Sequence, residues 1–111
     1  MIFVFGPLCS GKRAVAKDIL RCGDAELAER AVWDAQELAR GCADLAALAD
    51  ELSRREVVIA TEVGGGVVPS DARERADREA AGRLSCLLAA RADAVVRVFC
   101  GIPTVIKGEL P

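Results

Sequence analysis

The residues best suited to chemistry lie near the start of the chain, where a lysine follows a glycine-rich stretch. Glycines allow a tight turn whose backbone N–H groups point inward around an anion, and the lysine ammonium adds a positive charge there. This combination is typical of a loop that binds the phosphates of a nucleotide. The predicted nucleotide-binding residues are Gly6, Pro7, Leu8, Cys9, Ser10, Gly11, Lys12 and Arg13.

The elements on either side of this loop match what the chemistry needs. Residues 2–5 are a continuous apolar run that predicts a buried strand, and residues 14–20 predict a helix. A strand, then G-x-x-x-x-G-K, then a helix is the P-loop motif, in which the helix N-terminus adds its positive end to the phosphate site. The alternative, a glycine turn with a chance lysine, leaves this order of elements unexplained.

Arg13 departs from the P-loop pattern. The residue after the lysine is normally Ser or Thr, whose hydroxyl ligates Mg²⁺, whereas an arginine cannot ligate a cation. Arg13 instead adds a fixed positive charge beside the phosphates, and the Ser10 hydroxyl is not at the usual Mg²⁺ position. The sequence therefore predicts binding of ATP or GTP, but it does not support Mg²⁺-assisted phosphoryl transfer.

The rest of the chain predicts an α/β fold of the P-loop NTPase type, with three layers and a small, mainly parallel sheet. Strand patterns at residues 57–60, 94–99 and 102–107 alternate with helical patterns at residues 43–54 and 71–90. The predicted buried helix positions are Leu45, Leu48, Ala49, Leu52, Ala76, Ala80, Leu84, Leu87 and Leu88.

The sequence leaves two alternatives for each of two segments. Residues 26–40 keep a helical period, yet Ala31-Val32-Trp33 before Asp34 is also compatible with a short strand. Residues 61–70 predict a loop that begins Thr-Glu-Val-Gly. A carboxylate such as Glu62, at the end of a strand beside a P-loop, can hold Mg²⁺ or orient a nucleophile. A glycine turn with an exposed glutamate is the alternative, which spacing alone slightly favours.

The segment around Glu62 resembles the N-E-V-G-x-G-I-V-P motif of the bifunctional adenosylcobinamide kinase / adenosylcobinamide-phosphate guanylyltransferases of cobalamin biosynthesis, the CobU/CobP family. The likeness continues through Gly82-Arg83-Leu84 and residues 89–93 to Gly101-Ile102-Pro103. The P-loop matches the family's G-G-x-x-S-G-K-S motif. Its matching residues are Gly6, Ser10, Gly11 and Lys12.

The resemblance implies ATP- or GTP-dependent phosphorylation of adenosylcobinamide. It places Asp34, more loosely, on the aspartate of the family's V-D-C-L-T segment. The implied catalytic residues are Lys12, Asp34 and Glu62, and the implied metal ligands are Asp34 and Glu62. The alternative is a non-catalytic nucleotide-binding regulator or a partner of a complete family member.

The middle of the chain is shorter than in the family. Only eleven residues separate Leu20 from Val32, and the chain contains no histidine. The family's GMP-accepting histidine belongs to the missing segment. Guanylyl transfer through a phosphoramidate is therefore predicted to be absent.

Composition sets the remaining expectations. The 111 residues, 52% of them hydrophobic, predict one domain over residues 1–111. The net charge of −2 argues against a nucleic-acid partner, and no apolar run is long enough to span a membrane. Five cysteines without a C-x-x-C pair predict free thiols and a cytoplasmic location. A small sheet with long edges predicts a homo-oligomer.

Overall fold

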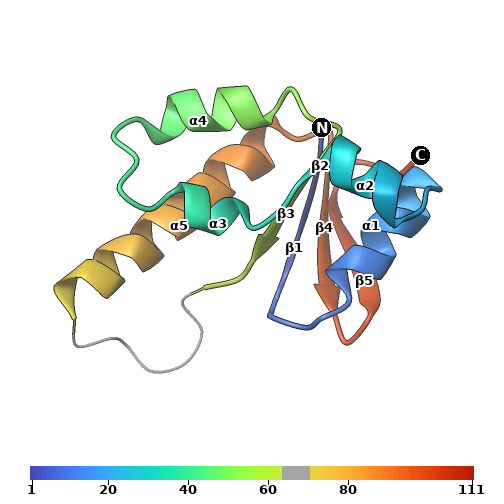
Figure 1. The fold of residues 1–111 in the computed structure, drawn as a ribbon, viewed down its shortest axis with the longest axis horizontal. Helices are drawn as coiled ribbons and strands as arrows, with labels where there is room; N and C mark the ends of the chain where they lie inside the picture. Colours follow the sequence, from blue (N-terminus) through green and yellow to red (C-terminus); the bar gives the residue numbers. More distant parts are fainter. Residues whose placement is uncertain (64–70) are drawn as a thin grey trace.

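A computed structural model describes residues 1–63 and 71–111 and shows a five-stranded sheet with helices on both faces (Figure 1). The strands lie in the order β2-β3-β1-β4-β5, and only β5 runs antiparallel to its neighbour. The predicted mainly parallel sheet is therefore confirmed. The strands are β1 (Ile2–Gly6), β2 (Ala31–Val32), β3 (Val57–Thr61), β4 (Ala94–Phe99) and β5 (Ile102–Lys107).

The helices divide between the two faces of the sheet (Figure 1). One face carries the first two helices and the other carries the remaining three. None of the helices in the described ranges combines the length and the apolarity needed to cross a membrane. The helices are α1 (Lys12–Leu20), α2 (Asp24–Arg30), α3 (Ala35–Leu38), α4 (Leu45–Leu52) and α5 (Ala72–Arg91).

Strand β1 is central because its side chains reach both halves of the core. Phe3 packs with Leu84 and Leu88 under α5, whereas Val4 packs with Val15 under α1. Successive residues of a strand point to opposite faces, so a strand covered on both faces must be apolar at nearly every position. This burial explains why residues 2–5 form a continuous apolar run.

The ambiguous segment at residues 26–40 contains both of the structures that its pattern allows. The helical period belongs to α2 and α3, and the two residues of β2 lie between them, paired with β3. The predicted loop at residues 61–70 begins one residue late, because Thr61 ends β3. Its glycine-rich part, residues 64–70, lies outside the described residues.

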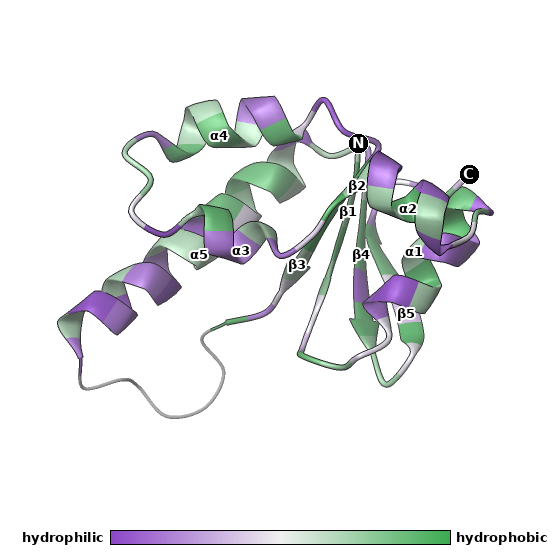
Figure 2. Ribbon diagram, in the orientation of Figure 1, coloured by the Kyte–Doolittle hydropathy of each residue, from purple (hydrophilic) through white to green (hydrophobic). Residues whose placement is uncertain are grey.

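The prediction for the buried side of α5 is wrong at Ala76, which is exposed. Ala81 is buried beside Leu84 and Leu88, and the N-terminal half of the helix extends beyond the sheet as a hydrophilic segment (Figure 2). Asp71 caps the start of the helix, since its carboxylate accepts a hydrogen bond from the Arg73 N–H at 2.8 Å. In α4, Ala49 and Leu52 are buried as predicted, but Leu45 and Leu48 are only half-buried.

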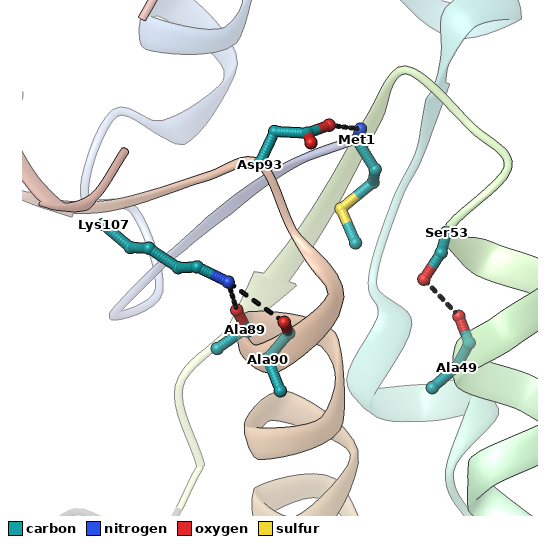
Figure 3. Close-up of polar contacts among 7 residues, drawn as sticks. All are labelled: Met1, Ala49, Ser53, Ala89, Ala90, Asp93 and Lys107. Atoms are coloured by element: carbon teal, nitrogen blue, oxygen red, sulfur yellow. Dashed lines mark hydrogen bonds and ion pairs between the residues drawn. The ribbon is translucent and has the colours of Figure 1, made fainter. Parts of the chain in front are cut away.

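Polar contacts join the elements at the end of the sheet where β1 begins (Figure 3). The Met1 amino group donates to the Asp93 carboxylate at 2.7 Å, just after α5. The Lys107 ammonium, from β5, donates to the carbonyls of Ala89 and Ala90 at 3.0 Å each. These contacts tie the start of β1 and the end of β5 to the C-terminal end of α5.

Replacing Leu88 with alanine is expected to lower the free energy of unfolding by about 2–5 kcal/mol, because the side chain is fully buried between α5 and the sheet. Leu87→Ala, at the half-buried neighbouring position, is the matched control and should cost clearly less. Urea denaturation followed by circular dichroism measures both. Equal losses would contradict the packing of α5 described here.

Candidate functional site

The loop between β1 and α1 folds over its own lysine. The Lys12 ammonium is buried and donates to the carbonyl oxygens of Gly6 at 3.3 Å and Pro7 at 2.6 Å. Cys9 and Gly11 have left-handed backbone conformations, with φ of 58° and 95°, which turn the chain into the first residue of α1. The lysine predicted to bind phosphate is thus held inside the loop.

The two glycines of the loop that belong to the P-loop motif, Gly6 and Gly11, lie too close to other parts of the chain to carry a side chain. A Cβ at Gly6 would overlap the carbonyl oxygen of Val98 in β4 and lie 2.8 Å from the Ser10 hydroxyl. A Cβ at Gly11 would lie 3.0 Å from the Cα of Gly101, whose N–H donates to the Ser10 carbonyl at 2.7 Å. The loop is therefore seated directly against β4 and the turn that follows it.

Ser10 carries an unsatisfied polar group inside this loop. Its side chain is buried, 6% exposed, and its hydroxyl oxygen has no hydrogen-bond partner among the described residues. Buried hydroxyl groups in folded proteins nearly always have a partner, which can be a ligand. An anion held by the loop would supply an acceptor for this hydroxyl.

Asp34 and Glu62 lie within electrostatic reach of Lys12. Burial lowers the pKa of the Lys12 ammonium, while the nearby Asp34, Cys9 and Glu62 raise it. Asp34 follows β2 in a left-handed conformation with φ of 51°, and its carboxylate accepts a hydrogen bond from Gln36 at 3.4 Å. The structure therefore brings the three predicted catalytic residues to one end of the sheet.

The Glu62 carboxylate has a partner that the sequence reasoning missed. Arg97 of β4 donates to both of its oxygens, at 2.6 and 3.1 Å, and its guanidinium lies 5.6 Å from the centroid of the Phe99 ring. These hydrogen bonds lower the pKa of the Glu62 carboxyl, and burial opposes the shift. The only sequence signal for this pair was a charged residue inside the apolar run of β4.

The donor set does not fit the Mg²⁺ ion that the resemblance implies. Arg13 replaces the usual hydroxyl ligand, and both oxygens of Glu62 are engaged by Arg97. Within residues 1–63 and 71–111, no group of three Cys, Asp or Glu side chains is arranged to hold a metal. Asp34 alone remains of the predicted metal ligands.

A pocket of about 670 Å³ opens beside the loop, between the loop, α3 and α5. Pro7 and Leu8 line it from the loop, and Glu62 lines it from just after β3. The other lining residues that are charged or polar come from α3, from just after α3 and from α5. These are Gln36, Glu37, Arg40, Glu74, Asp77 and Arg78.

The sequence profile of the cobinamide kinase / cobinamide phosphate guanyltransferase family (CobU) matches residues 25–106. The chain belongs to this family. Its α/β fold is P-loop NTPase-like, as the sequence predicted. The match begins after the loop at residues 6–13. A comparison with curated proteins gives no match.

Glu62→Gln is expected to lower the free energy of unfolding by about 0.5–1 kcal/mol at neutral pH, because a half-exposed ion pair with Arg97 is lost. The folded-state pKa of Glu62 is lowered, so this stabilisation is present above the ordinary glutamate pKa and is lost as the pH falls through the lowered value. The difference between the two proteins should therefore shrink below about pH 4.

Denaturation at several pH values tests this expectation. Glu29→Gln is the matched control, because Glu29 is exposed and its side chain makes no ion pair in the described part of the chain. A difference between wild type and Glu62→Gln that stays constant down to pH 3 would contradict the assignment.

Proposed function

We propose that the chain binds the triphosphate of ATP or GTP in the loop at residues 6–13 and uses it to phosphorylate adenosylcobinamide. The observation that carries the proposal is the buried hydroxyl of Ser10, which has no partner among the described residues and belongs to the same loop as the buried ammonium of Lys12. A phosphate oxygen would accept from the hydroxyl, and it would draw the Lys12 ammonium away from the carbonyls of Gly6 and Pro7. Membership of the family supports cobalamin biosynthesis as the context.

The pocket beside the loop is where we place the acceptor. It shares Pro7 and Leu8 with the phosphate loop, so a hydroxyl that enters it lies next to the transferable phosphoryl group. Of the two implied catalytic carboxylates, Glu62 lines the pocket but is held by Arg97, and Asp34 lies near Lys12 without lining the pocket.

A second candidate is a nucleotide-binding protein without turnover. Arg13 in place of the metal-ligating hydroxyl, and the engagement of Glu62 by Arg97, favour this alternative. A turnover assay with adenosylcobinamide and ATP or GTP decides between them. Formation of the phosphorylated product supports the enzyme, and nucleotide binding without product supports the second candidate.

Lys12→Ala is expected to weaken ATP and GTP binding about 10–100-fold, because a charge-assisted hydrogen bond to phosphate is lost. The matched control is Lys17→Ala, in the same helix, where the lysine instead pairs with Asp24 at 3.3 Å. That variant should bind as the wild type does. Isothermal titration calorimetry measures all three proteins. Equal affinity in wild type and Lys12→Ala would overturn the assignment of the loop.

No guanylyl-enzyme carried on histidine is expected, because the chain contains no histidine. The protein should be incubated with radiolabelled GTP, denatured and examined for acid-labile label by gel electrophoresis. Absence of a stoichiometric adduct is the expected result. An acid-labile adduct mapped to a lysine would mean that another nucleophile has taken over guanylyl transfer.

A further inference from the structure

The side chain of Arg13 rests on the only tryptophan of the chain. Its guanidinium carbon lies 5.1 Å from the centroid of the Trp33 ring. Arg13 is exposed in the first turn of α1, and Trp33 is half-buried at the end of β2, packed against the core on the α1 side. In the described part of the chain, Arg13 makes no ion pair with a carboxylate.

This contact is weaker than the one that a phosphate would offer. A guanidinium over an exposed aromatic face is held by modest electrostatic attraction, whereas guanidinium–phosphate pairs are charge-assisted and often bidentate. Arg13 directly follows Lys12, so its side chain leaves the backbone at the place from which a P-loop hydroxyl ligates the metal. A phosphate in the loop would therefore compete with Trp33 for the guanidinium.

The same guanidinium disfavours a divalent cation. A permanent positive charge at that position repels Mg²⁺ while it attracts the phosphate oxygens. The nearby Glu62 offers no compensating ligand, because Arg97 occupies both of its oxygens. The site therefore disfavours Mg²⁺ for two reasons. It lacks suitable ligands, and it places the charge of Arg13 where the ion would bind.

We propose that Arg13 takes the place of the divalent cation, so that the chain binds a metal-free polyphosphate group. On binding, the guanidinium leaves the ring of Trp33 and pairs with the phosphate oxygens. This inference rests on the proposed phosphate site at residues 6–13, and it specifies the ligand as the uncomplexed anion of a nucleoside triphosphate.

The test compares affinities for ATP, GTP and inorganic tripolyphosphate by calorimetry, in EDTA and in excess Mg²⁺. Wild type should bind at least as tightly in EDTA as in Mg²⁺. Arg13→Ser should bind about tenfold more weakly than wild type in EDTA, and Mg²⁺ should restore part of the loss. Arg54→Ser removes the same charge from an exposed site that makes no ion pair in the described part of the chain, and it should behave as the wild type.

Trp33 fluorescence supplies a second measurement that needs no variant. Because Trp33 is the single tryptophan, its emission should change when a ligand draws Arg13 away, and the same ligand should cause no such change in Arg13→Ser. Binding by wild type that is tenfold tighter in Mg²⁺, with no change in emission, would overturn this inference and leave the proposed phosphate site intact. Absence of binding under both conditions would overturn both.

Discussion

The ends of β1, β3 and β4 meet the loop at residues 6–13 around Gly6, and the candidate site depends on how closely they approach one another there. The carbonyl oxygen of Gly6 accepts hydrogen bonds from the Glu62 N–H at 2.8 Å and from the Lys12 ammonium. Its Cα faces the carbonyl of Val98 with no room for a side chain. The loop, the Glu62–Arg97 pair and the turn after β4 all take their positions from this contact.

Charged residues of both signs gather at that end of the sheet. In the spatial order of the strands, Asp34 follows β2 and Glu62 follows β3, and then Lys12 follows β1 and Arg97 belongs to β4, so two acidic residues lie beside two basic ones. The carboxylates of Asp34 and Glu62 both act to raise the pKa of Lys12, against the effect of its burial. Arg97 stabilises the anionic form of Glu62 and lowers its pKa. The acidic groups near Lys12 are partly neutralised before any ligand arrives, so an incoming phosphate meets a weaker repulsion than two free carboxylates would exert.

The sequence predicts those features of the fold and site whose residues are close together along the chain. The loop and its flanking elements follow from neighbouring residues, and the strand patterns at residues 57–60, 94–99 and 102–107 correspond to β3, β4 and β5, whereas they leave β2 undecided. The pairing of Glu62 with Arg97 joins residues 35 apart and requires the register of three strands, which no local pattern contains. The helical period predicts a buried Ala76, which is exposed, because the period does not reveal where the sheet beneath the helix ends.

The hairpin between β4 and β5 limits how the sheet can grow. Cys100 and Gly101 both have positive φ, as in a two-residue turn, and Pro103 then lies opposite Val98 on the outermost strand. A proline has no N–H to offer a further strand, so the exposed edge that carries Ile102 and Ile106 is interrupted near its start. Aggregation by continuous strand addition is thereby opposed at an edge that exposes large apolar side chains.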